Sequence, residues 1–241
     1  MIVRNGKEAI GLHRNGKEGI VAIRNGKIGF TKRVDDACYL MFRMYGEQNT
    51  PTMLKDRVGD NNGTITNGVY IPERKTLKFD NTRVSFGGEI FPDFGQEFVV
   101  MRYSSQGSSA RLSAETTTDG GYSTPYLKSS APVNAISYYA PPFDNALTPT
   151  WVMPANILFH IFYRYSSTTR LLECFVNGVK VNEATNISPR TSTLIAYIGA
   201  RNTNDRFFNG EFGLYGMHKR WLTDAEIMQN YIVEKFNFKI P

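Results

Sequence analysis

Three acidic residues lie close together in the segment EIFPDFGQE, where Glu89, Asp93 and Glu97 follow one another at a spacing of four. Two carboxyl groups can hydrolyse a glycosidic bond when they lie about 5 Å apart and flank the sugar. Pro92 and Gly95 interrupt this run, which is typical of a loop or bulge rather than of a regular strand. We therefore predict that these carboxylates form no catalytic pair. Replacing Glu89 or Glu97 by Gln should leave any glycan binding intact.

The three histidines, His13, His160 and His218, follow no spacing that is typical of metal ligands. No Ser-His-Asp or Cys-His arrangement for nucleophilic catalysis is readable in the chain. We expect His160 to be a strand residue within a sheet, and His13 and His218 to be exposed. The sequence therefore predicts a protein that is not an enzyme, with no catalytic residue, no metal ligand and no cofactor.

The two cysteines, Cys38 and Cys174, lie in the apolar runs ACYLMF and LLECFV. This pattern favours buried, reduced thiols that pack as small apolar side chains. A disulfide between them is the alternative, and it would require an oxidising compartment.

Exposed aromatic side chains beside polar groups could bind a glycan, because an aromatic face can stack on a sugar ring. Strand alternation buries about half of any such set, so some of these side chains must belong to the core. The candidates for a glycan site are Trp151, Tyr122, Tyr126, Tyr138, Tyr139 and Phe143. Trp151 lies in a Pro-rich connection and is the first to test, although it could equally close one end of the fold.

The stretch FFNGEFGLYGMHKRWLTDAEIMQNY, residues 207–231, predicts a strand followed by a helix. Phe212 and Leu214 alternate with other residues at period two, which indicates a strand with one buried face. Thr223 stands at an N-cap position with Glu226 three residues later, as in a capping box. We expect a short helix over residues 223–234. Leu222 and Ile227 can form the hydrophobic staple at its start, and Trp221 is the aromatic anchor before it.

This closing stretch resembles the end of laminin-G-like domains of the concanavalin A-like lectin/glucanase superfamily. Three earlier segments resemble the same family in the same order, so that the likeness covers roughly residues 38–234. They are LKDRVGDNNGTITN at 54–67, FVNGVKV at 175–181 and LIAYIGA at 194–200. The resemblance is specific for a fold rather than for an activity.

The resemblance implies an all-β fold, a two-sheet antiparallel jelly-roll sandwich over residues 35–241 with one short C-terminal helix. Glucan hydrolases of the superfamily carry an E-x-D-x-x-E strand, and EIFPDFGQE does not match it. Many laminin-G-like domains hold Ca²⁺ at a loop edge, which here would use Asp56, Asp60 and Asn61. The simpler interpretation is that these residues stabilise turns through their own backbone.

Residues 1–34 form a different unit, in which Arg-Asn-Gly-Lys recurs at 4–7, 14–17 and 24–27. Asn-Gly between extended residues is a strong hairpin signal. We therefore expect a small meander of β-ribbons, or three turns of a short β-solenoid. Such an element is marginal by itself and needs a partner.

The excess positive charge of the chain, +6, belongs to this N-terminal unit. Residues 1–33 hold eight basic and two acidic residues, whereas the rest of the chain is neutral. The basic residues could simply be solvated turn residues, or they could dock onto an acidic protein surface, nucleic acid or a membrane face. No aromatic residues interleave with them as single-strand binders require, so we favour a protein partner and no nucleic acid. No apolar run long enough for a signal peptide or a membrane span is present, so we expect no membrane insertion.

Two functions remain open. The first is a structural and adhesive virion protein, a phage head or tail fibre or decoration protein, whose arm anchors it to the particle and whose lectin-like head can bind glycans. The second is a bacterial carbohydrate-binding module or cell-surface lectin, located at the cell surface or secreted. In the first case we expect a homotrimer, since three arms can pack their apolar faces around one axis. The assembly residues are then Arg4, Asn5, Gly6, Ile10, Arg14, Asn15, Gly16, Ile20, Ile23, Arg24, Asn25 and Gly26.

Overall fold

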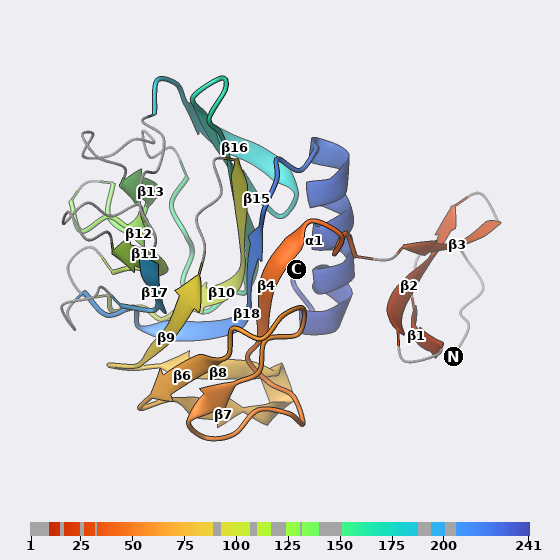
Figure 1. Cartoon of the computed structure of the whole chain (residues 1–241), viewed down its shortest axis with the longest axis horizontal. Coiled ribbons are helices and arrows are strands. Elements are labelled where there is room, and N and C mark those ends of the chain that lie inside the picture. The colour runs from red at the N-terminus through yellow and green to blue at the C-terminus, as the bar shows by residue number, and fades with distance from the viewer. Residues whose placement is uncertain are drawn as a thin grey trace.

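The structure is a computed structural model of the 241-residue chain. It describes residues 10–14, 17–24, 27–31, 33–88, 93–106, 110–116, 124–130, 132–139, 151–187, 194–200 and 206–241. These residues form antiparallel sheets with a single α-helix among them, α1 (Asp224–Phe238), near the C-terminus (Figure 1). The all-β prediction is confirmed.

The largest sheet has eight strands. Its strands occur in the order β16 (Val179–Ala184), β15 (Leu171–Val176), β14 (Phe159–Ser166), β10 (Phe94–Arg102), β18 (Gly210–His218), β8 (Thr76–Phe79) and β7 (Val69–Ile71), and β4 (Cys38–Arg43) also pairs with β18. The long apolar run at residues 157–165 thus forms a central strand.

A second sheet of five strands faces the first. Its order is β11 (Ser113–Thr116), β17 (Leu194–Ile198), β9 (Arg83–Gly88), β6 (Gly63–Thr66) and β5 (Met53–Leu54). A separate pair consists of β12 (Thr124–Leu127) and β13 (Ile136–Tyr139), and a 3₁₀ turn, η1 (Pro72–Arg74), lies between β7 and β8.

The main core contains the aromatic side chains that the two sheets direct toward each other. Phe98 of β10 and Tyr215 of β18 have ring centroids 5.3 Å apart, and Phe42 of β4 meets Phe86 of β9 edge to face at 5.2 Å. These four side chains are almost fully buried. Such offset and edge-to-face pairs add to the free energy gained by burying apolar surface.

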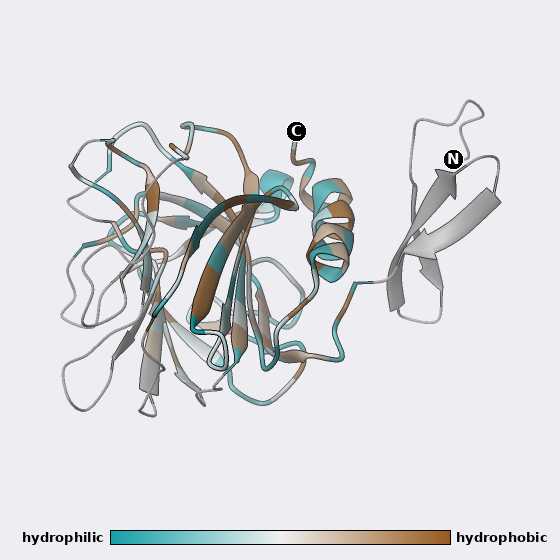
Figure 2. Ribbon diagram, turned by 90° about the horizontal axis from the view of Figure 1, so that it is seen from above, coloured by the Kyte–Doolittle hydropathy of each residue, from teal (hydrophilic) through white to brown (hydrophobic). Residues whose placement is uncertain are grey.

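Strand β18 is buried on both faces, although its sequence alternation predicted only one buried face. Helix α1 lies against the outer side of the large sheet (Figure 1), and Figure 2 shows brown apolar and teal polar residues alternating along it. Phe238 packs there with Val99 and Leu214 in a second cluster. The helix therefore covers the face that alternation alone would leave exposed.

The start of α1 is built as its sequence predicted. The N–H of Thr223 donates to Glu226 Oε2 at 2.7 Å, and the N–H of Glu226 donates to Thr223 Oγ1 at 3.3 Å, which completes the capping box. Leu222 and Ile227 share a buried cluster, as expected for a staple. The helix ends at Phe238, four residues beyond the predicted end. It is not long and apolar enough to cross a membrane, and no other described helix is.

At the N-terminus, β1 (Ile10–Arg14), β2 (Lys17–Arg24) and β3 (Lys27–Thr31) form a three-stranded antiparallel sheet. Arg14 pairs with Lys17 and Arg24 pairs with Lys27, so each connection contains two residues. The arm is thus a meander and not a solenoid. Arg4, Asn5 and Gly6 of the first repeat, and the Asn-Gly pairs at 15–16 and 25–26, lie outside the described residues.

Candidate functional site

The most unusual group of side chains is a buried polar cluster around Glu97, between the large sheet and α1. Glu97 belongs to the central strand β10 and is fully buried. Its carboxylate accepts hydrogen bonds from both Nη atoms of Arg33, one of them at 2.7 Å. His160 Nε2 lies 2.8 Å from Oε1, and His218 Nε2 lies 2.9 Å from Oε2.

A second buried carboxylate, that of Glu234 on α1, extends this cluster. Arg33 Nη1 donates to it at 3.0 Å, and Arg43 of β4 donates to its two oxygens at 3.1 Å each. Asn230, also on α1, donates to Glu97 at 3.4 Å and accepts the backbone N–H of Val34 at 2.8 Å. The Glu97 cluster therefore joins Arg33, at the base of the arm, to β10, β14, β18, β4 and α1.

The electrostatics of the Glu97 cluster fix its charges at neutral pH. Burial by itself would raise the pKa of Glu97, but the charge of Arg33 and the histidine hydrogen bonds hold that pKa well below its ordinary value. Burial likewise opposes the ionisation of Glu234, and Arg43 and Arg33 together keep its pKa lowered. Burial lowers the pKa of His218 despite the adjacent Glu97 carboxylate. Glu97 and Glu234 are thus ionised and His218 is neutral.

This arrangement corrects two expectations from the sequence. His218 is fully buried rather than exposed, because α1 covers the outer face of β18. Glu97 lies within a regular, fully buried strand rather than in a loop, since β10 begins at Phe94, just after the Pro92 interruption. His160 is a strand residue, as predicted. Replacing Glu97 would consequently disturb the fold itself.

The Glu97 cluster is unsuited to catalysis or metal binding. Arg33, Glu97, His160, His218 and Glu234 are each at most 5% exposed, so a substrate cannot reach them. Each histidine Nε2 is directed at a carboxylate oxygen. Among the residues that the structure describes, no group of three His, Cys, Asp or Glu side chains could hold a metal ion.

The other acidic candidates have local structural partners. Asp93 accepts hydrogen bonds from the backbone N–H of Ser167 at 2.7 Å and from its hydroxyl at 3.0 Å. Glu89 lies outside the described residues.

The carboxylate of Asp56 is 2% exposed and accepts three backbone N–H groups, those of Met41, Val58 and Asn61, at 3.0, 3.1 and 3.3 Å. Asp60 points to solvent and lies 3.7 Å from Lys55 Nζ. This is how acidic residues stabilise turns.

The structure describes only part of the predicted glycan site. Trp151 is half-buried and meets Phe159 edge to face, with ring centroids 5.0 Å apart. Tyr126 is 7% exposed and lies under the guanidinium of Arg111, 4.5 Å from the ring centroid. Tyr138 is buried in the core, Tyr139 ends β13, and Tyr122 and Phe143 lie outside the described residues. Of this set, Trp151 is the described residue with an accessible ring.

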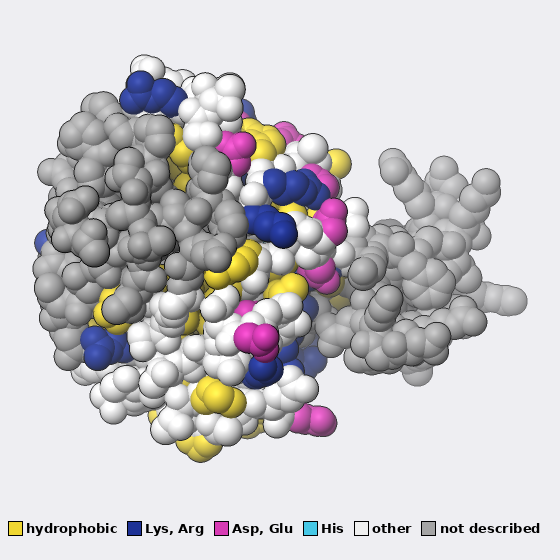
Figure 3. All heavy atoms as spheres, viewed as in Figure 1, with side chains coloured by type: hydrophobic (Ala, Val, Ile, Leu, Met, Phe, Trp, Pro, Cys, Tyr) yellow, Lys and Arg dark blue, Asp and Glu magenta, His cyan; other side chains and the backbone are white. Residues whose placement is uncertain are grey.

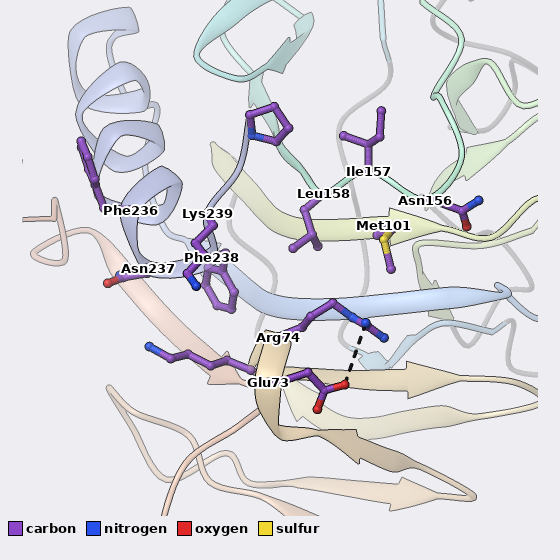
Figure 4. Close-up of a pocket in the computed structure, with 12 residues that line it drawn as sticks. Glu73, Arg74, Met101, Asn156, Ile157, Leu158, Phe236, Asn237, Phe238 and Lys239 are labelled. Carbon is purple, nitrogen blue, oxygen red and sulfur yellow. Dashed lines mark ion pairs between the residues drawn. The ribbon is translucent and has the colours of Figure 1, made fainter. Parts of the chain in front are cut away.

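A hollow of about 470 Å³ opens at the C-terminal end of α1 (Figure 4). Its apolar wall includes Met101, Leu158 and Phe238, and Arg74 and Lys239 lie at its rim. Arg74 is already engaged, because Nε and Nη2 donate to the buried carboxylate of Glu211 at 2.7 and 2.6 Å. The hollow contains none of the aromatic residues that the sequence singled out.

The anchor Trp221 holds a second charged group beside α1. Arg164 lies 4.2 Å over the Trp221 ring, and its Nε donates to Glu173 at 2.6 Å. A third contact joins Arg164 Nη2 to Asp224 in the first turn of α1, at 2.6 Å. Trp221 thus fixes the approach to the helix.

Both cysteines are free and buried, as predicted. On the face that Figure 3 shows, the apolar side chains of the described residues form small separate areas among polar and charged ones. That part of the surface therefore offers no broad apolar patch.

The family model for the Laminin_G_3 domain of the concanavalin A-like lectin/glucanases superfamily matches residues 97–228, more than half of the chain. The chain belongs to this family. The match begins at Glu97 and includes the capped start of α1, so the closing stretch of the sequence indicated the family correctly. A search of curated protein sequences found no match.

Solved structures share the fold at low sequence identity. A sialidase from Trypanosoma rangeli in complex with sialic acid is similar with a TM-score of 0.69 and 10% identity, over 95% of this chain and 44% of the sialidase. Domain 4 of AbnA, an extracellular arabinanase from Geobacillus stearothermophilus, in complex with arabinotriose, has a TM-score of 0.67 and 12% identity, over 81% of this chain and all of that domain.

The receptor-binding domain of botulinum neurotoxin type G is similar with a TM-score of 0.60 and 13% identity, over 83% of this chain and 52% of that one. Against the first sialidase structure, the chain spans about a third of that protein's length. At these identities the likeness establishes the fold alone.

Proposed function

We propose that this protein is a non-enzymatic adhesive module whose sandwich recognises glycans and whose N-terminal arm attaches it to a larger assembly. The observation that supports the proposal is that Glu97 is buried and ion-paired within a lectin/glucanase fold. Its carboxylate lies in a central strand, yet it is closed off by Arg33 and two histidines and is out of reach of a substrate. Glu97 is therefore not available as one of the two carboxyl groups that glycoside hydrolysis requires.

Trp151 is the first candidate for the glycan contact. Its ring is partly exposed while Phe159 supports it from the side, which holds an aromatic face in place. A rigid ring of this kind loses little conformational entropy when it stacks on a sugar.

The test is binding of the full chain to an array of glycans, followed by Trp151→Ala. We expect binding to fall about tenfold or more, as for an aromatic anchor at an interface. Tyr45→Ala is the matched control, because Tyr45 is 46% exposed elsewhere and has no assigned role. Equal binding by the Trp151 variant and the native chain would exclude this site, and sugar release from a polysaccharide would exclude the non-enzymatic assignment.

The arm supports a role in an assembly, and we place it in a virion, as a phage head or tail fibre or decoration protein. Its three strands leave edges that proteins normally pair or cover, and residues 1–33 carry the whole net charge of the chain. Three arms around one axis would cover those edges, so a homotrimer is the expected state.

Deletion of residues 1–32 tests the arm, with the cut placed so that Arg33 is retained. Arg33 and Val34 both bond to the sandwich, and removing Arg33 would leave Glu97 buried without its cation. We expect the truncated protein to be a folded monomer that no longer joins its parent particle. The full chain with the three substitutions Ile10→Asp, Ile20→Asp and Ile23→Asp should show the same loss of assembly. If sedimentation gives the truncated protein the same oligomeric state as the full chain, the arm is not the assembly element.

The alternative is a bacterial carbohydrate-binding module or cell-surface lectin. It is favoured by the likeness to domain 4 of the arabinanase, which the chain covers in full. Capsid or tail genes beside the gene would favour the virion role, and a neighbouring catalytic domain would favour the module.

A further inference from the structure

Arg33 is the one member of the described Glu97 cluster that is not held by a sheet or a helix. Glu97, His160 and His218 project from the adjacent strands β10, β14 and β18. Arg43 belongs to β4, and Glu234 belongs to α1. Arg33, in contrast, lies on the connector 33–36, which has no regular structure and links the arm to the sandwich.

Few contacts fasten this connector. The N–H of Val34 donates to Asn230 at 2.8 Å, and the N–H of Cys38 donates to the Asp35 carbonyl at 3.0 Å. Asp36 contributes an exposed ion pair with Arg220 at 3.4 Å. Val34 also packs against a buried apolar cluster that includes Leu222 and Ile227. The guanidinium of Arg33 is the buried ionic tie between the connector and the body.

Arg33 and Arg43 are positive, and Glu97 and Glu234 are negative, so these four buried charges balance. Asp35, on the connector and partly exposed, also pairs with Arg33 Nε at 2.8 Å. A proton added to His218 while Arg33 stays in place would set a second positive charge beside Glu97, which burial and the Arg33 charge both oppose.

His218 can supply a positive charge in place of the arginine. Its Nε2 already faces Glu97 Oε2 at 2.9 Å, and its Nδ1 is buried with no hydrogen-bond partner among the described residues. With Arg33 withdrawn, a protonated His218 imidazole would be a cation facing Glu97.

We propose that the Glu97 cluster is an acid-sensitive latch for the arm, in which uptake of one proton by His218 is linked to withdrawal of Arg33 from Glu97. The proton comes from solvent and takes over the positive charge that Arg33 supplied, so the charge beside Glu97 is conserved. No covalent bond changes. Acid thereby frees the connector, and with it the arm, while the sheet stays folded.

The remaining groups that face the histidines do not take over this role. Cys38 on β4 stays a neutral thiol, since burial raises its pKa to about 12. From α1, Asn230 is uncharged, and the Tyr231 ring lies 5.9 Å from that of His160. Arg43 is held by Glu234 on the far side of Arg33.

Hydrogen exchange of the full chain, followed by mass spectrometry on peptides that cover residues 33–38, tests the latch. After correction for intrinsic rates, one linked proton should change the opening equilibrium by up to about tenfold per pH unit. We expect this segment to lose protection by about tenfold or more between pH 7.5 and pH 5.5, while β10 and β18 keep theirs. Unchanged protection of 33–38 at pH 5.5 would overturn the proposal. Loss of protection in β10 and β18 together with 33–38 would also overturn it, because the sheet would then be opening with the connector.

Two variants separate the latch from general stability. The variant His218→Gln keeps an amide donor for Glu97 Oε2 but cannot be protonated, so its connector should stay protected at pH 5.5. If it opens as the native chain does, His218 is not the sensor.

Arg33→Gln provides a readout that does not depend on the His218 variant folding. Its connector should be open at both pH values, and the His218 titration followed by NMR should move to higher pKa, because the Arg33 charge that lowers it is removed. An unmoved titration together with native protection at pH 7.5 would overturn the latch. The inference stands apart from glycan binding, which neither measurement involves.

Discussion

Arg74 and Glu211 form a two-pronged ion pair that ties η1 to the central strand β18. Nε and Nη2 of Arg74 lie 2.7 and 2.6 Å from the two oxygens of Glu211. The carboxylate is fully buried and also accepts the hydroxyl hydrogens of Thr76 and Tyr103, at 2.5 and 2.7 Å. Arg74 also lines the hollow at the end of α1 (Figure 4), so its ion pair with Glu211 holds one wall of the hollow in place.

Arg74→Met should destabilise the protein, because Glu211 would stay buried with its charge uncompensated. We expect a loss of about 1–3 kcal/mol in the free energy of unfolding, below the value for a fully buried pair since Arg74 is partly exposed. Urea denaturation measures it. Glu73→Gln is the control, because Glu73 meets Arg74 only at 3.9 Å on the surface, and it should change stability by less than about 0.5 kcal/mol. Equal losses in the two variants would contradict this assignment.

Thr223→Ala should weaken the start of α1. It removes the side-chain acceptor for the N–H of Glu226, and such a cap contributes about 1 kcal/mol. Thr223→Ser retains the hydroxyl and should match the native protein in thermal unfolding. A Ser variant as unstable as the Ala variant would show that the cap is not the cause.

The sequence predicted the features that depend on neighbouring residues. Thr223 and Glu226 are three positions apart, and their capping box follows from local geometry alone. Asn177 and Gly178, within the family-like segment 175–181, connect β15 and β16, and both have positive φ, 50° and 77°, as a tight Asn-Gly turn requires. The four family segments fall on strands in the expected order.

The Glu97 cluster could not be predicted in this way. Arg33, His160 and His218 are separated from Glu97 by 64, 63 and 121 positions, so only the strand order brings them together. One signal was present in the sequence. Glu97 is followed directly by the apolar run FVVM, and an acid within a buried strand requires a partner. The packing of α1 against β18 was not predicted for the same reason. The alternation of residues along β18 depends on that strand alone and carries no information about which element packs against it.

Trp221→Leu should loosen the joint between β14 and α1. The change removes the ring face over which Arg164 lies at 4.2 Å, a contact worth about 0.5–2 kcal/mol. Trp221→Tyr keeps an aromatic face and should lose less. Chemical denaturation followed by circular dichroism measures both variants, and a Tyr variant no better than the Leu variant would argue against the cation–π contact.

Acid should destabilise the protein in two stages. The pKa values of Glu97, Glu234 and Glu211 are all lowered by folding, so the unfolded chain binds protons first and their stabilisation is lost as the pH falls below about 4.5. The pKa of His218 is lowered as well, which makes unfolding take up a proton below about 6.5. We therefore expect the urea midpoint to start falling below pH 6.5 and to fall more steeply below pH 4.5. A midpoint that rises between pH 7 and pH 5 would contradict these charge states.

The two thiols should be almost inert in the folded protein. Burial raises the pKa of both Cys38 and Cys174 to about 12, and the thiolate is the reactive form. At pH 8 the thiolate fraction is therefore on the order of a thousandfold below that of a free cysteine. Reaction with a disulfide reagent should be slow in buffer and rapid for both thiols in denaturant. Cys38 should react first, because it is 8% exposed and adjoins the connector, whereas Cys174 is fully buried. Prompt reaction of Cys174 in buffer, or a mass showing that the two cysteines form a disulfide, would contradict this description of the core.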